Sequence, residues 1–474
     1  MNILKHYTSK GIMGIPHNYL KKFNNNHDLN IAINRAIQIF DKYPWCVDDI
    51  QDNMLNFYNE NTVSPFIPIS AQGPWIISNN ASIIYDTGGY GMLGFGHSPK
   101  WALETLSKPH VMANIMTPNL IQRHFTNRIK YSIGKKTGLK CPYNKFACLN
   151  SGSESMELAM KITDSNTKIN NQNKKQTSFI VLKNSFHGRT DKAARLSNST
   201  ENIYKKHLFS FNNNNTNIHT VEINNENELY NTFKNIQNDT FVEAIIMEPV
   251  MGEGNPGQAI APSFYNLARK LTHESNSFLI IDSIQSGIRT NGCLSIIDYP
   301  GFEKISSPDM EIFSKAINSG QYPLSVLALT YNAAEYFKKG TYGNTMTSNP
   351  KALEIGIDTL NRINNDVVNN INEKGIQFKN MLKNIQTKYP DIATHVTGTG
   401  LLLALHIDNS YPVVQDKGLE YICRYNGLNV IHGGQNALRF TPYFKITTEE
   451  IKLIEKILDK SFSQLKLHNI NNTP

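Results

Sequence analysis

The chain has 474 residues, of which 40% are hydrophobic, so it is long enough to bury a substantial core and to form more than one structural unit. Its formal charge of +8 comes from 47 basic and 39 acidic residues spread along the chain, a pattern that does not indicate a nucleic-acid partner. The five cysteines are too few and too scattered for a disulfide framework or a zinc site, and every apolar run is far shorter than the roughly 20 residues of a membrane helix. We therefore expect a globular protein of a reducing compartment, with no metal centre and no membrane partner.

The first 27 residues bear on the location of the protein. They carry four lysines and no acidic residue, which is similar to an organellar presequence, but they contain no arginine and no apolar segment typical of a secretory signal. We expect a cytoplasmic protein, with an organellar matrix as the alternative if the chain is eukaryotic.

Short apolar runs alternate with helical patterns between Cys141 and Leu329. The runs are too short for buried helices, and Gly, Pro, Ser or Asn residues bound them, so they predict strands of a mainly parallel sheet. This large domain is expected at residues 101–340. Amphipathic helical patterns and one further apolar run follow, and they predict a small α+β domain at 341–474 that residues 1–100 complete. The predicted strands of the large domain are 146–149, 179–182, 244–247, 278–281, 310–313 and 326–329.

Ligands of parallel α/β sheets gather at the carboxyl ends of the strands, so the polar residues after each run are informative. The first run leads into Asn150-Ser151-Gly152-Ser153-Glu154, which opens a helical pattern. A helix N-terminus of this kind can bind phosphate, although the residues alone are more typical of a plain N-cap. The second run leads to Phe186-His187-Gly188, where the aromatic ring could stack on a flat cofactor or pack in the core.

Charged residues follow the later runs. Glu248 follows the third run and Asp282 the fourth, and a carboxylate at a strand end is costly to bury without a cation or a strong donor. A protonated pyridine nitrogen is such a cation, and an N-cap is the alternative role for Asp282. Lys315 follows the fifth run; desolvation there would lower the pKa of its amine until the neutral form can attack an aldehyde, whereas an ordinary lysine would extend to solvent.

In this order the segments resemble the class III aminotransferases, the family of ornithine, acetylornithine, 4-aminobutyrate and diaminobutyrate aminotransferases. The resemblance covers about Trp75 to Ile457. It implies the α/β fold of the fold type I transferases that depend on pyridoxal 5'-phosphate, with a mainly parallel seven-stranded sheet flanked by helices in the large domain and a small α+β domain beside it.

The resemblance also implies roles in cofactor binding. Ser151, Gly152 and Ser153 match the phosphate-binding turn, and Phe186-His187 matches the aromatic residue that stacks on the cofactor ring and the histidine after it.

The catalytic residues are implied in the same way. Lys315 matches the Schiff-base lysine, and Asp282 matches the aspartate that pairs with the pyridine nitrogen. Gln285 matches the glutamine near the phenolic oxygen of the cofactor, and Glu248 matches the Glu-Pro strand end.

Three further matches concern the substrate and a second subunit. Thr345 corresponds to a threonine that reaches the cofactor phosphate of the neighbouring subunit, which implies a homodimer. Arg439 corresponds to the arginine that binds a substrate carboxylate, and Glu253 to a glutamate that can close over that arginine. Tyr90 is a candidate for the substrate pocket on its residue type alone, and a core position is its alternative.

Some positions depart from the family pattern, and they put the substrate in doubt more than the cofactor chemistry. Ser283 stands where an acidic residue usually follows the aspartate, Arg289 is displaced by one position, and Tyr342 replaces a histidine. Thr347-Ser348 stands where the family has Gly-Gly.

The expected function is transfer of an amino group from an amino acid or a terminal amine to a 2-oxo acid such as 2-oxoglutarate or pyruvate. Lys315 and Asp282 would be the catalytic residues. An amino acid racemase or epimerase on the same scaffold is the alternative enzyme, because the same lysine can return a proton to the opposite face of the α-carbon. A catalytically silent binding protein is the alternative from a different class.

Overall fold

The computed structural model describes residues 13–39, 53–55, 57, 62, 64–112, 117–173, 175–212 and 217–471, with side chains up to residue 467. Residues 1–12, which carry part of the lysine-rich N-terminal pattern, lie outside the described residues. The chain divides into two compact units. We call residues 104–368 the large unit, and residues 1–103 together with 369–474 the small unit.

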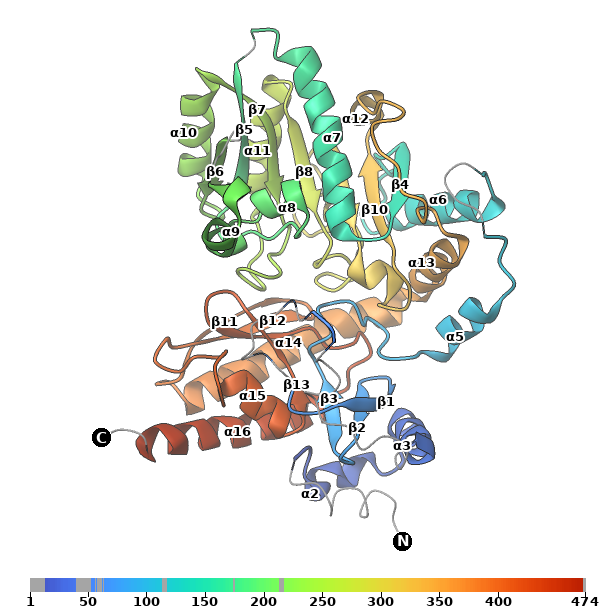
Figure 1. Cartoon of the computed structure of the whole chain (residues 1–474), viewed down its shortest axis with the longest axis vertical. Coiled ribbons are helices and arrows are strands. Elements are labelled where there is room, and N and C mark those ends of the chain that lie inside the picture. The colour runs from blue at the N-terminus through green and yellow to red at the C-terminus, as the bar shows by residue number, and fades with distance from the viewer. Residues whose placement is uncertain are drawn as a thin grey trace. The chain divides into compact units, whose positions relative to one another are not determined.

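The large unit is built on one seven-stranded sheet (Figure 1). Each predicted apolar run lies in one of its strands, and the seven-stranded, mainly parallel sheet of the expected fold is confirmed. Only β10 runs against its two neighbours. In spatial order the strands are β4 (Lys145–Leu149), β10 (Ser325–Leu329), β9 (Met310–Phe313), β8 (Phe278–Asp282), β7 (Thr240–Met247), β5 (Gln176–Leu182) and β6 (Asn217–Val221).

Strand β6 is the one that the apolar runs did not predict. Its sequence is Asn-Ile-His-Thr-Val, and only its last residue is buried, because β6 lies at the edge of the sheet and pairs with β5 alone. An edge strand buries less apolar surface than a central one, so its sequence carries a weaker signal.

Helix α7 (Gly152–Asn170) covers one face of this sheet (Figure 1). Met156 and Ile162 of the helix belong to the same buried cluster as Met310 and Ile312 of β9. Side chains alternate along a strand, so the residues between them, including Glu311, point to the opposite face. This alternation places a charged residue in the interior of the unit.

The other helices of the large unit connect the strands or flank the sheet. Helix α13 belongs here, although the predicted boundary placed residues 341–368 in the C-terminal domain: its Gly356 lies directly against the ring of Phe125 on α6. These helices are α6 (Leu120–Ser132), α8 (Asp191–Arg195), α9 (Glu201–His207), α10 (Glu226–Gln237), α11 (Pro262–Glu274), α12 (Tyr331–Glu335) and α13 (Pro350–Arg362), with 3-10 turns η4 (Asn198–Thr200), η5 (Phe209–Phe211), η6 (Ile296–Asp298) and η7 (Lys315–Asn318).

The small unit contains two four-stranded sheets. In the first, β13 pairs in parallel with β3, so that Leu428 lies opposite Tyr85. Segments from the two ends of the chain therefore share one sheet. The strands of the first sheet are β1 (Pro68–Gln72), β2 (Trp75–Ser78), β3 (Ile83–Asp86) and β13 (Leu428–Asn429), and those of the second are β11 (Ala393–Thr399), β12 (Leu402–Ile407), β15 (Ala437–Phe440) and β14 (Ile431–Gly433).

Aromatic residues fill part of the core of this unit. Trp75 and Tyr85 are fully buried, and their ring centroids lie 5.2 Å apart in an edge-to-face contact. None of the described helices is long and apolar enough to cross a membrane. The helices are α2 (His17–Leu20), α3 (His27–Ile39), α15 (Leu419–Tyr425) and α16 (Thr448–Asn471), with η1 (Lys21–Phe23), while α5 (Lys100–Ser107) and α14 (Asn365–Lys388) run from one unit into the other.

A buried glutamate caps α16, and its ionisation makes stability depend on pH. The carboxylate of Glu450 accepts the backbone N–H of Thr447 at 2.7 Å and the hydroxyl of Tyr443 at 3.1 Å. Burial raises the pKa of Glu450 from its ordinary 4.5 to about 7. The folded state therefore binds this proton more tightly than the unfolded state, and the stabilisation is lost as the pH rises through about 7.

We predict that Glu450→Gln flattens the pH dependence of thermal unfolding. The wild-type protein should lose up to about 3 kcal/mol through this group between about pH 5 and about pH 8, and the variant should not. Calorimetry at several pH values measures the difference. Glu449→Gln is the matched control, because Glu449 lies in the same helical turn but is exposed. Equal slopes in the wild type and in Glu450→Gln would contradict the prediction.

Candidate active site

Three charged residues of the large unit lie at one edge of its sheet. Strands β7, β8 and β9 are parallel neighbours, so their carboxyl ends meet at the same edge. Glu248 directly follows β7, Asp282 ends β8, and Lys315 follows β9 after one residue. The structure therefore brings together the three residues that the sequence placed after separate strands.

The amine of Lys315 lies beside the turn that follows β8. Its Nζ donates a hydrogen bond to Oε1 of Gln285 at 2.6 Å. Lys315 has a φ of +50°, a left-handed conformation that is uncommon for residues other than glycine, and it begins η7. The preceding Ser314 is tied by its hydroxyl to the carbonyl of Leu324 at 2.9 Å. This backbone conformation fixes the direction in which the lysine leaves the sheet.

Asp282 is a buried carboxylate with a histidine partner. Its side chain is 3% exposed, and its Oδ2 lies 2.8 Å from Nδ1 of His187, whose side chain is fully buried. The other oxygen accepts the backbone N–H of Ile284 at 3.1 Å. His187 is itself held by its backbone N–H, which donates to the hydroxyl of Ser197 at 2.8 Å. A carboxylate in this position is prepared for a further positive partner, since its cost of burial is only partly compensated by these donors.

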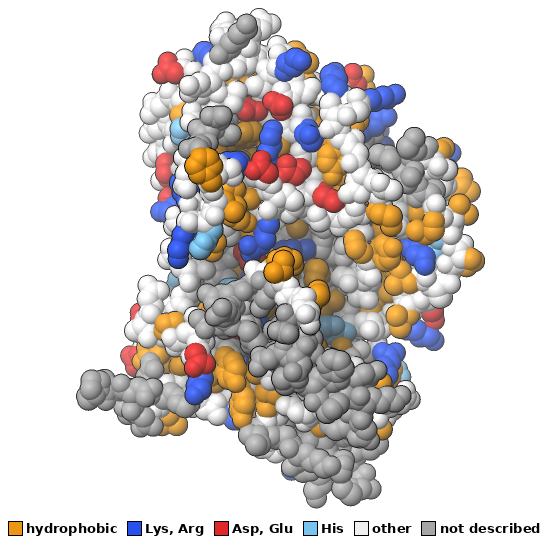
Figure 2. Space-filling view, viewed as in Figure 1, with side chains coloured by type: hydrophobic (Ala, Val, Ile, Leu, Met, Phe, Trp, Pro, Cys, Tyr) orange, Lys and Arg blue, Asp and Glu red, His pale blue; other side chains and the backbone are white. Residues whose placement is uncertain are grey.

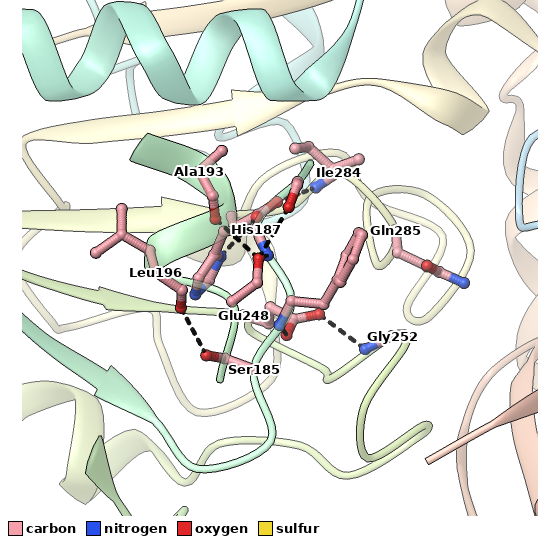
Figure 3. A network of polar contacts seen from close by, with 12 residues as sticks. Ser185, His187, Ala193, Leu196, Glu248, Gly252, Ile284 and Gln285 are labelled. Carbon is pink, nitrogen blue, oxygen red and sulfur yellow. Dashed lines mark hydrogen bonds and ion pairs between the residues drawn. The ribbon is translucent and has the colours of Figure 1, made fainter. Parts of the chain in front are cut away.

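Glu248 ties two loops together at the centre of the site (Figure 3). Its Oε1 accepts the backbone N–H of Phe186 at 3.0 Å, and its Oε2 accepts that of Gly252 at 2.8 Å. Burial, the largest cause, raises the pKa of Glu248 to about 7, while His187 opposes the shift and Asp282 adds to it. Both carboxylate oxygens are thus directed at backbone amides, and Glu248 holds the loops that surround the site.

The first turn of α7 forms the next part of the site. Ser151 is the N-cap and accepts the N–H of Glu154, whose carboxylate reaches back to the N–H of Asn150 at 2.9 Å. A Cβ on Gly152 would stand 2.6 Å from the side chain of Ile284, so glycine permits this turn to lie against the segment after Asp282. The hydroxyl of Ser153 accepts the N–H of Arg189 at 3.2 Å. A helix N-terminus in this place suits a phosphate group.

The remaining predicted residues are Thr345 and Glu253 in the large unit and Arg439 and Tyr90 in the small unit. Thr345 is exposed, and its neighbour Asn344 donates to the carboxylate of Glu154 at 3.1 Å, so this segment lies beside the first turn of α7. Glu253 is half-buried in the loop after β7. Arg439 and Tyr90 belong to the small unit, where the fully buried guanidinium of Arg439 lies 5.8 Å from the ring centroid of Tyr90.

Two residues near the site were not singled out from the sequence. Ser197 fixes the backbone of His187, and Glu311 accepts the hydroxyl of Ser283 at 2.6 Å. Ser197 left no signal, because an isolated serine in a loop is unremarkable. Glu311 did leave one, since it is a charged residue inside an apolar run of strand length, and such a residue needs buried partners.

The described residues fit a phosphorylated pyridine aldehyde. The buried Asp282 suits a protonated ring nitrogen, the α7 N-terminus suits the phosphate, and the amine of Lys315 suits the aldehyde. The ring of Phe186 is half-buried, with the guanidinium carbon of Arg189 at 5.4 Å from its centroid. Among the described residues there is no cluster of three or more His, Cys, Asp or Glu side chains that could hold a metal ion.

Comparison with known proteins agrees with this chemistry. The sequence profile of the family described as Aminotransferase class-III matches residues 57–462. A mitochondrial acetylornithine aminotransferase of Debaryomyces hansenii is 28% identical over 433 residues, which cover 88% of this chain and 89% of that protein. An acetylornithine aminotransferase of Clostridium acetobutylicum is 30% identical over 67% of this chain and 77% of its own length.

Solved structures share the fold. The ornithine aminotransferase of Toxoplasma gondii matches with a TM-score of 0.74 at 22% identity, over 91% of this chain and 98% of that one. An S-selective transaminase of Bacillus megaterium matches with a TM-score of 0.73 at 18% identity, over 88% and 97% of the two chains.

The chain belongs to the class-III aminotransferases. It is an enzyme that uses pyridoxal 5'-phosphate and moves an amino group from an amino donor to a 2-oxo acid. The resemblance on which the sequence prediction rested is therefore confirmed at the level of family, cofactor and reaction.

We predict that Asp282→Asn weakens cofactor binding and lowers kcat by about a hundredfold or more, because a neutral amide cannot stabilise a protonated ring nitrogen. The asparagine oxygen can still accept the N–H of Ile284, so the turn should keep its shape. Fluorescence titration of the apoenzyme with pyridoxal phosphate, together with kcat, measures the effect. Asp309→Asn is a control, because Asp309 directly precedes β9 and so lies at the end of that strand away from Lys315. Wild-type cofactor affinity in Asp282→Asn would refute the role of Asp282.

Proposed function

We propose that the enzyme takes the terminal amino group of an ornithine-like donor, such as ornithine, N-acetylornithine, 4-aminobutyrate or diaminobutyrate, and passes it to 2-oxoglutarate or pyruvate. The curated relatives described above are named for acetylornithine, which supports a donor of this shape. The observation that carries the proposal is the amine of Lys315 at 2.6 Å from Gln285, in the turn that follows the buried carboxylate of Asp282.

In the proposed site, Lys315 is the residue that transfers protons. When bound, pyridoxal phosphate supplies an electron-withdrawing ring that accepts the electron pair released as a C–H bond next to the donor nitrogen breaks. The Nζ of Lys315 would hold the cofactor through its aldehyde before the donor arrives, and once released it would accept the proton that the donor carbon loses and return it later in the reaction. Gln285 orients that nitrogen through its side-chain oxygen.

The surrounding residues orient the cofactor. Asp282 meets the ring nitrogen, and His187 keeps the aspartate in place through the 2.8 Å contact. Ser151, Gly152 and Ser153 hold the phosphate at the N-terminus of α7. Phe186 would cover one face of the ring, and Glu248 fixes the backbone of Phe186.

The substrate carboxylate is assigned to Arg439. A guanidinium binds a carboxylate through two parallel hydrogen bonds, and the full burial of Arg439 strengthens such a pair. We propose that Glu253 has the role that the family resemblance implies, and helps the enzyme to distinguish the terminal amine of the donor from the second carboxylate of the 2-oxo acid. Tyr90, whose ring faces Arg439 in the small unit, would line the same pocket.

We further propose a homodimer. Figure 2 shows hydrophobic side chains gathered on the side of the large unit where α6 and α13 lie. Leu120 is 74% exposed and Val111 is 79% exposed, and such exposed apolar surface is typical of a protein interface. Thr345 is exposed on a turn beside α7, from where it could serve the phosphate site of the partner subunit. A cytoplasmic or organellar-matrix location is proposed as well, because one relative is mitochondrial.

A donor screen tests the proposed function. The purified enzyme, loaded with pyridoxal phosphate, is offered ornithine, N-acetylornithine, 4-aminobutyrate and diaminobutyrate, each with 2-oxoglutarate or pyruvate. We expect one donor to convert the bound cofactor to its amine form, and Lys315→Ala to abolish turnover, while the exposed Lys339→Ala retains it. Arg439→Lys should raise the KM of the 2-oxo acid about tenfold or more, because lysine cannot form the bidentate pair.

Three results would contradict the proposal. Turnover without any 2-oxo acid, with inversion of the donor, would indicate the epimerase reaction instead. Full activity of Lys315→Ala would remove Lys315 from the chemistry, and unchanged 2-oxo acid kinetics in Arg439→Lys would remove Arg439 from substrate binding.

Mixed dimers test the position of Thr345. Lys315→Ala destroys a site through its own lysine, and Thr345→Glu should destroy a site by repelling the phosphate. If Thr345 serves the partner site, a mixed dimer of the two variants has one doubly damaged site and one intact site, and a random mixture should regain about a quarter of wild-type activity. No recovery, with mixed dimers verified by differential tags, would place Thr345 in its own subunit's site.

A further inference from the structure

A second buried carboxylate lies in the large unit, on the strand that leads to Lys315. Glu311 is the second residue of β9, and its side chain is fully buried. It points away from the face that α7 covers, because the adjacent Met310 and Ile312 pack in the cluster with α7. None of the roles described so far uses this residue.

Four donors surround the carboxylate of Glu311. The hydroxyl of Tyr143 donates to Oε2 at 2.6 Å, and that of Ser283 donates to Oε1 at 2.6 Å. The backbone N–H of Ile296 donates to Oε1 at 2.9 Å, and the hydroxyl of Ser295 donates to Oε2. Burial raises the pKa of Glu311, and the donors from Ser283, Ser295, Tyr143 and Ile296 act against that shift.

A buried carboxylate is energetically unfavourable if its side chain only fills space in the core. Removing a carboxylate from water costs several kcal/mol, and an apolar residue of similar volume would avoid that cost in the middle of a sheet. The four donors lower the cost only because they are aligned on both oxygens. The four donors are therefore held in a fixed geometry around the carboxylate.

The donors clamp the turn that carries Gln285. Ser283 immediately precedes this turn, which runs from 284 to 294, and Ser295 and Ile296 immediately follow it. Both ends of the turn are thus tied to one side chain on β9. Lys315 lies four residues farther along the same chain segment, and its amine meets Gln285 at 2.6 Å. The carboxylate therefore links the segment that carries Gln285 to the strand that leads to Lys315, in addition to the backbone hydrogen bond from Ser283 to the carbonyl of Ile312 at 3.0 Å.

We propose that Glu311 is a positioning residue. Its carboxylate holds the turn that carries Gln285 against β9, the strand that leads to Lys315, and so sets the orientation of the lysine amine for proton transfer. The inference rests on the proposed roles of Lys315 and Gln285. Ser283 takes part in the same clamp, at the position where the family that this sequence resembles usually carries an acidic residue.

Glu243 provides a matched control. It is also a glutamate on a central strand, with its side chain buried, its pKa raised by burial, and the hydroxyl of Thr167 as a donor at 3.0 Å. It lies on β7 five residues before Glu248, which along a strand is about 16 Å from the site edge. The two glutamates share burial and differ in their link to the site.

The experiment compares Glu311→Gln and Glu243→Gln with the wild-type holoenzyme. Three quantities are measured: the pH titration of the visible absorbance of the bound cofactor, the separate kcat and KM values with the best donor, and the unfolding temperature. For Glu311→Gln we expect the titration midpoint to move by about half a pH unit or more and kcat to fall about tenfold, with the donor KM unchanged. Glu243→Gln should lower the unfolding temperature and leave the titration and kcat unchanged.

A lower unfolding temperature in Glu311→Gln with wild-type titration and kcat would overturn the inference, because a purely structural carboxylate would behave in that way. If Glu311→Gln does not fold, Ser283→Ala and Tyr143→Phe each remove one donor and should give smaller shifts of the same sign; wild-type titration in both would overturn it equally. Lys315→Ala separates the two claims. If the pH-dependent absorbance of the cofactor persists in Lys315→Ala, the proposed role of Lys315 fails. If that absorbance change is lost in Lys315→Ala but is not shifted in Glu311→Gln, only the role of Glu311 fails.

Discussion

A carboxylate removed from water at the end of a central strand is the constraint around which the large unit is arranged. Asp282 is buried, and its contacts with His187 and with the N–H of Ile284 satisfy it only in part. In the proposed function a positive ring nitrogen completes the arrangement, and in a dry site that interaction is far stronger than in water. The same desolvation that makes Asp282 costly without a ligand makes it effective with one.

Two neighbouring glutamates are also buried carboxylates, and each is held by different hydrogen-bond donors. Glu248 directs both oxygens at backbone amides of the loops that enclose the site, and Glu311 directs both at the ends of the turn that carries Gln285. Each of the parallel strands β7, β8 and β9 thus has a buried acidic side chain on it or directly after it. In the proposed function the three acids hold different parts of the site: Asp282 the cofactor ring, Glu248 the enclosing loops and Glu311 the turn that carries Gln285. Preorganised polar groups of this kind are what an enzyme needs where charge develops during the reaction.

In the proposed function, the residues that hold the cofactor and the arginine that binds the substrate carboxylate belong to different units. Lys315, Asp282 and the α7 N-terminus belong to the large unit, whose sheet provides a rigid frame. Arg439 and Tyr90 belong to the small unit, which is assembled from both ends of the chain through the pairing of β3 with β13. In the proposed function, substitutions in the small unit can therefore change which donor is accepted while the residues that hold the cofactor stay the same. This agrees with a family that acts on several terminal amines.

The sequence by itself determined every strand of the large sheet except β6, and the polar residues that follow these strands. Short apolar runs between chain-breaking residues have few other stable structures, and a parallel sheet must collect the residues after its strands at one edge, so Glu248, Asp282 and Lys315 could be expected to converge. Family, cofactor and reaction followed from the order of these motifs.

Only the tertiary structure decided how the acids are used. Periodicity shows neither the edge position of β6 nor the reversed direction of β10, because both depend on which strands come to lie side by side. Glu248 was predicted among the cofactor-binding residues, and the structure adds that its oxygens accept amides of two loops. The donors to Glu311 lie up to 168 residues away in the sequence. Hydrogen bonds between distant segments leave no local trace in a sequence, since each donor alone is an ordinary serine, tyrosine or backbone amide.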